Sequence, residues 1–380
     1  MSKRFLSFIG LIALVALAAT IVSACAGSAT PAPTAAPAAP APTTAAAAKP
    51  AAPAAAPTTA AAPAAQFPKM DIKLGHGGVL DMSYSKGADK FSELVKERTG
   101  GNVNVQVFPN SALGSEKDML EQVKNGVIQI SLTTPVMLAT YDGWGPIGVT
   151  AMPYVFPGNT DEEQYPAVMK LLRGPVFKEI NDSAAKISGV RALDLGWWYG
   201  TRNLTTKSKQ VLHPDDAKGL KIRTMDTPLA KAALGAIGVT VTPMAVAELY
   251  NAMQMGVVEG QENPINTIYA SKYYEVQKYL SLTGHMTMTV LMVTNDKWFQ
   301  GLPPALQDVL QKSMYDAGDY QSDIQLKMNK QNLQDLKDKG MVVAEVNKAE
   351  FADKTKDAWK EFQPIFGAGM YEKITAAAKN

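Results

Sequence analysis

Hydrophobic positions in the first part of the folded body recur with two different spacings. Asn102–Phe108 alternates strictly between polar and apolar residues, which predicts a strand. Residues 84–98 carry apolar residues at helical spacing and are followed by Gly100, so they predict a helix that ends there. The same patterns predict strands at 70–74 and 127–132 and a helix at 116–125.

These elements alternate along the chain with short connections. Ser115 precedes the helix at 116–125 and Asp118 follows three residues later, which indicates a capping box at the helix start. Alternating strands and helices predict a parallel, doubly wound sheet and therefore an α/β fold. Ligands of such sheets bind outside the carboxyl ends of the strands, so residues that follow each strand are candidates for a site.

A faint internal repeat indicates two related halves. Residues 119–135 read as a helix, a glycine stop, a short strand and a proline, and residues 249–264 repeat this order 130 positions later, one residue short at the end. If the halves are related, Thr133-Thr134-Pro135 and Glu262-Asn263-Pro264 are equivalent strand ends that face one cleft. The alternative is coincidence, because a helix, a glycine and a strand are a common sequence of elements.

One helical pattern, from Pro303 to Gly340, is much longer than the others. A helix of roughly 35 residues is about 50 Å long, which exceeds one lobe, so the pattern predicts a helix that crosses between two lobes. Gly318 lies inside this pattern at a cost of about 1 kcal/mol relative to alanine. We interpret Gly318 as a position where the helix bends.

The first 25 residues have the layout of a secretory signal. Lys3 and Arg4 precede an apolar run from Phe5 to Val22, and small residues lead to Cys25. Val22-Ser23-Ala24-Cys25 resembles a bacterial lipobox, in which the chain is cut before a cysteine that carries lipid. Cys25 is the only cysteine, so an intrachain disulfide is excluded. The alternative is an uncleaved anchor, because 18 apolar residues can just span a bilayer.

Residues 26–66 consist almost entirely of Ala, Pro, Thr and Ser, which predicts a semi-extended tether without a core. The whole chain has 37 basic and 35 acidic residues. Three of the basic residues (Lys3, Arg4 and Lys49) and none of the acidic ones precede residue 67, so the body carries a net charge of −1. This balance argues against nucleic-acid binding, and no second long apolar run follows, so we expect a soluble body.

Two arginines and an asparagine are the strongest candidates for chemistry. Arg202 follows Gly200-Thr201, Arg223 ends the segment 218–223, and Asn263 precedes a proline. Arginine carries five N–H donors in a planar fork that suits a carboxylate. This pattern fits a protein that binds a small acid, and it supplies neither a nucleophile nor a base.

The motifs of common enzyme classes are missing from the sequence. The three histidines (His76, His213 and His285) are scattered, and no cluster has the spacing of zinc ligands. Residues 83–86 match S-x-x-K, but the accompanying S-D-N and K-T-G elements of penicillin-binding enzymes are absent. The phosphate-binding glycine motifs are also absent. We therefore expect no enzyme activity, no metal and no cofactor.

Taken together, eight segments of the body resemble the solute-binding proteins of tripartite ATP-independent periplasmic (TRAP) transporters, of the C4-dicarboxylate-binding type. The resemblance covers nearly the whole body. Its segments are Leu113–Glu116, Met152–Phe156, Gly200–Arg202, Asp216–Arg223, Ala233–Ala236, Glu248–Gln254, Glu259–Pro264 and Tyr274–Tyr279. The chain departs from the family at Glu259, where aspartate is common, and at Met253, where leucine is common; neither is an expected contact.

The resemblance implies a periplasmic-binding-protein fold in which two α/β lobes close over an organic acid. We expect lobe I to comprise residues 67–199 and about 288–327, and lobe II residues 200–287 and about 328–380. The resemblance also implies a small and a large membrane subunit encoded elsewhere, with transport coupled to sodium.

The resemblance assigns roles to three residues. Arg223 is expected to make paired hydrogen bonds to the ligand carboxylate, Arg202 to assist it, and Asn263 to add a polar contact. Each has a plainer alternative: Arg223 as a surface arginine, Arg202 paired with an acid across the cleft mouth, and Asn263 as the turn former of an Asn-Pro step.

Position alone adds further candidates. Trp198 is expected to line the pocket, and strand alternation places it opposite Trp197 and Tyr199. Thr133 and Thr134 are candidates because they follow a predicted strand.

His76 and Glu116 are weaker candidates for ligand contact. Glu116 has an alternative role, because its charge complements the positive start of its helix.

The sequence thus predicts an exported, lipid-anchored, monomeric solute-binding protein of a TRAP transporter. We expect a ligand with one carboxylate, because Arg202 and Arg223 can share one and no third basic residue occupies a recognisable strand end. The ligand tail is expected to lie along Trp198. A sensory lipoprotein that feeds a signalling receptor, or a binding protein of another transporter class, would have a similar sequence.

Overall fold

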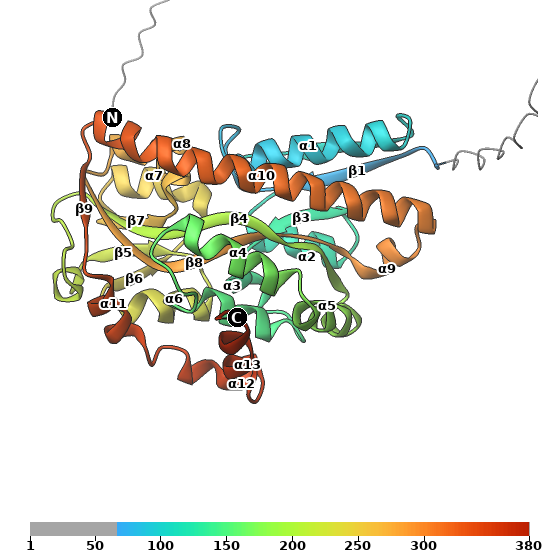
Figure 1. Cartoon of the computed structure of the whole chain (residues 1–380). Coiled ribbons are helices and arrows are strands. Elements are labelled where there is room, and N and C mark those ends of the chain that lie inside the picture. Colours follow the sequence, from blue (N-terminus) through green and yellow to red (C-terminus); the bar gives the residue numbers. More distant parts are fainter. Residues whose placement is uncertain (1–66, 380) are drawn as a thin grey trace, which may run out of the picture. The chain divides into compact units, whose positions relative to one another are not determined.

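The computed structural model describes residues 67–379, so the predicted signal, Cys25 and the tether lie outside the described residues. Within residues 67–379, nine strands form one sheet in the order β2-β1-β3-β8-β4-β7-β5-β6, with β9 paired to β8 (Figure 1). The strands are β1 (Met70–Gly75), β2 (Val103–Phe108), β3 (Ile130–Thr133), β4 (Val190–Thr206), β5 (Lys221–Thr224), β6 (Thr240–Pro243), β7 (Gly260–Asn263), β8 (Tyr279–Asn295) and β9 (Val342–Glu345).

Helices cover both faces of this sheet. In Figure 1, α1, α8 and α10 lie over one face, and α5 and α6 lie over the other. The α-helices are α1 (Ser83–Arg98), α2 (Glu116–Lys124), α3 (Pro135–Leu138), α4 (Asp161–Leu172), α5 (Pro175–Ser188), α6 (Pro228–Gly235), α7 (Val246–Gln254), α8 (Ile265–Ala270), α9 (Asp296–Gln300), α10 (Pro304–Asp338), α11 (Lys348–Thr355), α12 (Gln363–Phe366) and α13 (Met370–Ala377). Short 3-10 helices are η1 (Gly145–Ala151), η2 (Pro214–Ala217), η3 (Tyr273–Glu275) and η4 (Lys360–Phe362).

The sheet is mixed, which corrects the expectation of a parallel sheet. β1 is parallel to β2 and β3, and β5 is parallel to β6 and β7. The pairs β3–β8, β8–β4 and β4–β7 at the centre are antiparallel. The local pattern of strands and helices therefore predicts the parallel strands on each side of the sheet. It does not predict the antiparallel pairing of β4 with β8 that joins them.

Two long strands connect the two lobes. β4 and β8 have 17 residues each, and at roughly 3.3 Å per residue each strand is about 55 Å long. β3 pairs with the last part of β8, whereas β7 pairs with the last part of β4. Because β4 and β8 run in opposite directions, these pairings place β1–β3 and β5–β7 at opposite ends of the sheet, which gives the two-lobe fold.

The internal repeat is present in the structure. α2 and α7 have nine residues each and begin 130 residues apart, and β3 and β7 follow at the same interval. Gly126 and Gly256 follow these helices with φ of 74° and 72°, a left-handed conformation that favours glycine. Thr133 and Asn263 are therefore equivalent strand ends, without the one-residue offset of the sequence comparison.

The capping box predicted at Ser115 and Asp118 is present at the start of α2, and the long helix is confirmed as α10, which has 35 residues. Buried glutamines of α10 hold β4 where it crosses between the lobes. Gln321 Nε2 donates to the carbonyl oxygen of Trp198, and Gln325 Nε2 donates to that of Tyr199, both at 2.7 Å.

Gly318 of α10 has a packing role. A β-carbon there would lie 2.6 Å from Nε1 of Trp197, so glycine permits the close approach of α10 to β4.

The C-terminal helices differ from the expected division into lobes. α12 and α13 pack against η1, and the core of this region includes Phe366 and Ile374 together with Trp144 and Ile147. Residues 363–377 therefore pack with elements assigned to lobe I, whereas the sequence placed them in lobe II. The other predicted boundaries of the lobes stay predictions.

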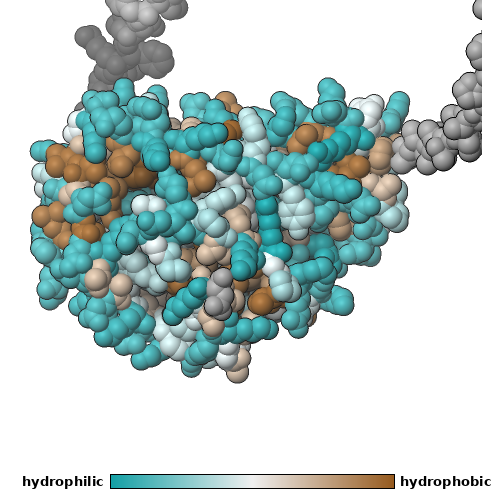
Figure 2. All heavy atoms as spheres, viewed as in Figure 1, coloured by the Kyte–Doolittle hydropathy of each residue, from teal (hydrophilic) through white to brown (hydrophobic). Residues whose placement is uncertain are grey.

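Apolar residues lie mainly in three buried clusters, one large and two smaller. The smaller clusters centre on Leu249 and Ile268 of α7 and α8, and on Ile222 and Leu234 of β5 and α6. The face seen in Figure 2 is accordingly mostly hydrophilic, with hydrophobic groups gathered in limited areas. Among residues 67–379, no helix has the length and apolar character needed to cross a membrane.

Candidate functional site

A cavity of about 340 Å³ lies at the carboxyl ends of the parallel strands. Lobe II lines it with Arg202 of β4, Arg223 of β5 and Asn263 of β7, and lobe I with Glu116 of α2 and Thr134 after β3. This volume suits a small ligand. The structure thus brings five of the eight predicted ligand-binding residues to one cavity.

Arg223 is a buried cation without a carboxylate partner among residues 67–379. The residue is 3% exposed, and its Nε and Nη2 donate to the carbonyl oxygen of Met244 at 3.1 and 2.8 Å. No residue of the described body accepts a hydrogen bond from Nη1. Burial lowers the pKa of the Arg223 guanidinium from its ordinary value. Because an unpaired buried charge is costly, an anion beside Arg223 would be stabilised.

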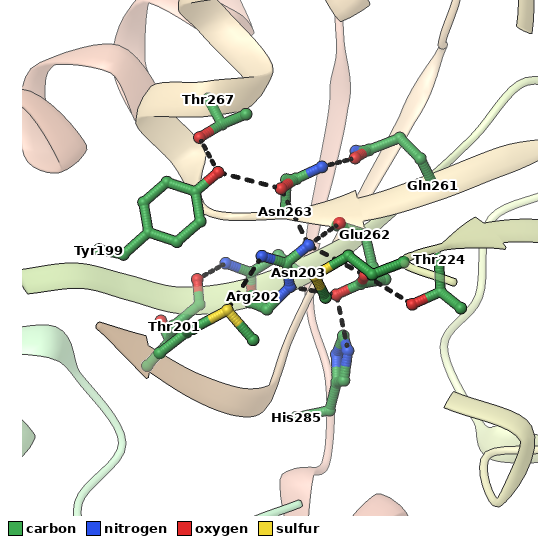
Figure 3. A network of polar contacts seen from close by, with 12 residues as sticks. Tyr199, Thr201, Arg202, Asn203, Thr224, Gln261, Glu262, Asn263, Thr267 and His285 are labelled. Carbon is green, nitrogen blue, oxygen red and sulfur yellow. Dashed lines mark hydrogen bonds and ion pairs between the residues drawn. The ribbon is translucent and has the colours of Figure 1, made fainter. Parts of the chain in front are cut away.

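Arg202 is equally buried, but its charge is compensated within lobe II. Its Nε and Nη2 donate to Oε2 and Oε1 of Glu262 at 2.5 and 2.9 Å, a bidentate pair (Figure 3). Within residues 67–379, the hydrogen-bond acceptor of the remaining nitrogen, Nη1, is the sulfur of Met288, at 3.7 Å. Arg202 therefore pairs with an acid on the adjacent strand β7 and not across the cleft mouth, and only Nη1 lacks a strong acceptor.

Glu262 lies at the centre of this network, although no site role was expected for it. Burial raises the pKa of Glu262, but the positive charge of Arg202 and the contact with His285 outweigh burial and lower the pKa to about 2. Nε2 of His285 lies 3.4 Å from Oε2, and the hydroxyl of Thr224 donates to Oε1 at 3.4 Å. Glu262 is thus held as a buried carboxylate dedicated to Arg202.

Asn263 connects Arg202 to the wall of the cavity. Its Oδ1 accepts from Nη2 of Arg202 at 2.9 Å and from the hydroxyl of Tyr199 at 3.3 Å. Its Nδ2 donates to Gln261, and Thr267 donates to Tyr199 at 2.9 Å (Figure 3). Asn263 therefore orients Arg202 and Tyr199 in addition to lining the cavity.

Glu116 lines the same cavity as the arginines, from lobe I. Its Oε1 accepts three hydrogen bonds: from the backbone N–H of Thr134 at 2.6 Å, the hydroxyl of Thr134 at 2.8 Å and the hydroxyl of Thr133 at 2.9 Å. Thr133 is fully buried and lies behind the cavity wall. Thr133 therefore positions Glu116 and does not line the cavity.

Trp198 does not line the cavity, which corrects the predicted position of its ring. The residue is fully buried, and its ring contacts Tyr165 of α4 edge-on, with centroids 5.6 Å apart. The predicted alternation holds, since Trp197 approaches α10 on the opposite face of the sheet. The cavity lies on the side of Tyr199, and Tyr84 and Tyr199 are its aromatic residues. The ligand tail expected along Trp198 has no room there.

His76 also lies outside the cavity lining. It is fully buried, its Nδ1 accepts from the N–H of Gly78 at 3.2 Å, and its ring contacts Tyr84 edge-on. Burial lowers the pKa of His76 to about 4, so the ring is neutral at pH 7. His76 supports Tyr84, which lines the cavity.

Residues 67–379 contain no group of three or more His, Cys, Asp or Glu residues arranged to hold a metal ion. The charged groups of the site are Arg202, which Glu262 neutralises, Arg223, which has no counter-charge within residues 67–379, and Glu116 of lobe I, whose Oε1 is fully hydrogen-bonded.

Known proteins match most of this chain. Residues 75–364 match the family DctP, described as bacterial extracellular solute-binding protein, family 7. The chain is 30% identical over 313 residues to the C4-dicarboxylate-binding periplasmic protein DctP of Rhodobacter capsulatus, which covers 80% of this chain and 87% of that protein. It is 31% identical over 285 residues to the 2,3-diketo-L-gulonate-binding periplasmic protein YiaO of Escherichia coli, which covers 74% and 83%.

A solved structure shows the same similarity. The sugar acid binding protein DctPAm of Advenella mimigardefordensis, in complex with galactonate, matches with a TM-score of 0.76 and 27% identity, over 82% of this chain and 98% of that chain.

Proposed function

The chain belongs to bacterial extracellular solute-binding protein family 7, and we propose that Arg223 captures the carboxylate of a small organic acid for delivery to TRAP membrane subunits. The family and its relatives are periplasmic solute-binding proteins of TRAP transporters, and they are not enzymes. Small organic acids are the ligands of such proteins, so the chain is a TRAP solute-binding protein for an organic acid.

The observation that carries this proposal is the uncompensated charge of Arg223. The guanidinium is buried in the cavity wall, bonds only to the carbonyl of Met244 and keeps Nη1 without an acceptor within the described body. A ligand carboxylate at this place would supply the missing counter-charge and accept bidentate hydrogen bonds. Nη1 of Arg202 is available as a further donor.

The charges of the site favour a monocarboxylate. Glu262 compensates Arg202, so the lobe II wall carries one surplus positive charge, that of Arg223. One carboxylate neutralises that charge. A second one would meet Glu116 on the opposite wall. The relatives include binding proteins named for C4-dicarboxylates and for a sugar acid. The number of surplus charges in the cavity therefore distinguishes a dicarboxylate ligand from a monocarboxylate ligand.

Export and anchoring belong to the same proposal. The lipobox-like sequence that ends at Cys25 supports a lipid anchor outside the cytoplasm, and the tether would give the body reach from the membrane. We expect a monomer. An intact mass of the native protein without an acyl addition at Cys25 would contradict the anchor.

The proposal is tested by measuring the binding of organic acids to the purified full chain with tryptophan fluorescence and calorimetry. Lysine offers a point charge in place of the planar fork, so we expect Arg223→Lys to weaken binding by at least about 30-fold, the low end of the cost of breaking a buried charged pair. Near-native affinity of Arg223→Lys would contradict the assigned contact. Succinate or malate binding at least about tenfold tighter than every monocarboxylate would contradict the charge count.

A further inference from the structure

Glu116 presents one bonded and one unbonded oxygen at the cavity. All three of its hydrogen bonds, from Thr133 and Thr134, end at Oε1. Within residues 67–379, Oε2 accepts no hydrogen bond and forms no ion pair. A carboxylate that served only to hold the turn after β3 would need Oε1 alone. The second oxygen is therefore an unpaired acceptor on a residue that lines the same cavity as Arg223.

The three donors also fix the position of this acceptor. Rotation of the Glu116 side chain away from the cavity would break all three hydrogen bonds at once and leave the buried hydroxyl of Thr133 without its acceptor. Glu116 is in addition the first residue of α2, where the positive end of the helix favours a negative side chain. A fixed acceptor of this kind selects between ligands, because it cannot move aside for a group that does not fit.

We propose that Oε2 of Glu116 determines specificity by accepting a hydrogen bond from a ligand hydroxyl and by repelling a second carboxylate. The inference rests on the proposed capture of one carboxylate by Arg223. It names the ligand class as hydroxylated monocarboxylic acids, with the carboxylate toward lobe II and a hydroxyl toward lobe I. A ligand without hydroxyls would leave Oε2 desolvated and unpaired, which costs free energy.

The other charges of the cavity lining agree with this orientation. Asp226 and Glu248 add two carboxylates, and Lys117 is the cation of the lining besides the two arginines. Asp226 is already paired with Lys231 at 2.8 Å. Apart from Lys117, the cavity therefore offers no counter-charge for a second carboxylate, whereas a hydroxyl group can both donate to Glu116 and accept from Ser111 in the same lining.

Matched ligands of two lengths test the proposal with the full chain. The four-carbon set is erythronate, butyrate and succinate, and the six-carbon set is galactonate, hexanoate and adipate. At one length or both, we expect the hydroxylated acid to bind at least about tenfold tighter than the plain acid and the diacid, the size of one hydrogen bond to a charged group. Equal or weaker binding of the hydroxylated acids at both lengths would overturn the inference.

Glu116→Gln separates the inference from the proposed function. Glutamine keeps Oε1 for Thr133 and Thr134 but replaces Oε2 with an N–H₂ donor, so the melting temperature should fall only slightly, through loss of the negative charge at the start of α2. We expect the hydroxylated acid to lose about tenfold in affinity, the diacid to gain a similar factor, and the plain acid to change less than about twofold.

The matched control is Glu121→Gln, which removes the same charge from an exposed position of α2 and should leave the ligand ranking unchanged. An unchanged ranking in Glu116→Gln would overturn the assignment of Oε2, even if Arg223→Lys abolishes binding. If no acid binds, or if Arg223→Lys binds normally, the proposed function fails first.

Discussion

The two lobes approach the cavity with the same backbone and with opposite chemistry. Gly75 of β1 pairs with Ser131, and Arg223 of β5 pairs with Gln261, which lies 130 residues after Ser131 in the equivalent strand. Gly75 is therefore the lobe I counterpart of Arg223. A β-carbon at Gly75 would lie 2.7 Å from the sulfur of Met119, so the side chain of Met119 packs in lobe I against the position where lobe II carries the cation.

The helices of the repeat differ in the same way. Glu116 and Val246 are the first residues of α2 and α7, and both line the cavity. One supplies an acceptor and the other an apolar surface. The repeated unit thus sets where side chains enter the cavity, and a few positions decide the charge. A ligand with an acidic end and a hydroxylated end would be oriented by this asymmetry.

Arg202 of lobe II depends on Glu262 for its counter-charge, and loss of this pair should reduce stability the most. Glu262→Gln leaves this guanidinium fully buried without a counter-charge. We expect the free energy of unfolding to fall by about 3–5 kcal/mol, as for other buried pairs that lose one partner. Chemical denaturation without ligand measures it.

The control is Glu97→Gln, on the exposed side of α1, which should stay within about 0.5 kcal/mol of the parent. A similar small change in Glu262→Gln would show that the pair does not stabilise the fold. The effect also depends on pH. Because the pKa of Glu262 is lowered from 4.5 to about 2, its contribution is fully present above pH 4.5 and is lost as the pH falls toward 2. The unfolding free energies of the parent and of Glu262→Gln, plotted against pH, should therefore converge between pH 4.5 and pH 2.

The next effect is specific to lobe I, where His76 follows Gly75. Burial lowers the pKa of His76 from 6.5 to about 4, so the unfolded chain binds a proton that the folded chain excludes between these values. Stability is therefore lost as the pH falls from 6.5 toward 4, by about 3 kcal/mol in all. We expect His76→Gln to remove this part of the slope in denaturation curves measured from pH 7 to pH 4.

The comparison variant is His213→Gln, at an exposed histidine. Its hydrogen bond with Glu350 raises the pKa of His213, so its contribution has the opposite sign: present at low pH and lost as the pH rises. A slope between pH 6.5 and pH 4.5 that survives in His76→Gln would contradict the assignment of acid sensitivity to lobe I.

Local pattern was enough to predict much of the fold. The strands at 70–74 and 102–108, the helices at 84–98 and 116–125, and the 35-residue α10 all lie within a few residues of their predicted places. The antiparallel centre was missed because β4 and β8 pair across about 90 residues of chain, and no local spacing encodes that contact. The same reason applies to the packing of α12 and α13 on η1.

The candidate site likewise includes residues that the sequence indicated and residues whose roles depend on contacts in the fold. Strand ends and the family resemblance indicated Arg202, Arg223 and Asn263, and all three line the cavity. The strand end 262–264 was expected to face the cleft, but a glutamate next to Asn263 in sequence does not reveal which arginine it neutralises. Trp198 was misplaced because alternation gives the relative orientation of neighbouring side chains but not which face of β4 meets the cavity.

The two arginines of lobe II should respond differently to the same substitution, one through ligand binding and the other through stability. Arg223→Met removes a buried cation that has no counter-charge in the described body, so the lost bonds to the Met244 carbonyl are offset by relief of desolvation. We expect the ligand-free unfolding free energy to stay within about 1 kcal/mol of the parent. Arg202→Met leaves Glu262 as a buried charge without its partner, so its unfolding free energy should fall by about 3–5 kcal/mol. Added organic acid should raise the melting temperature of the parent and leave Arg223→Met unchanged. A ligand-free loss in Arg223→Met as large as that of Arg202→Met would show that Arg223 is a structural residue, and the asymmetry between the two lobes would then need another origin.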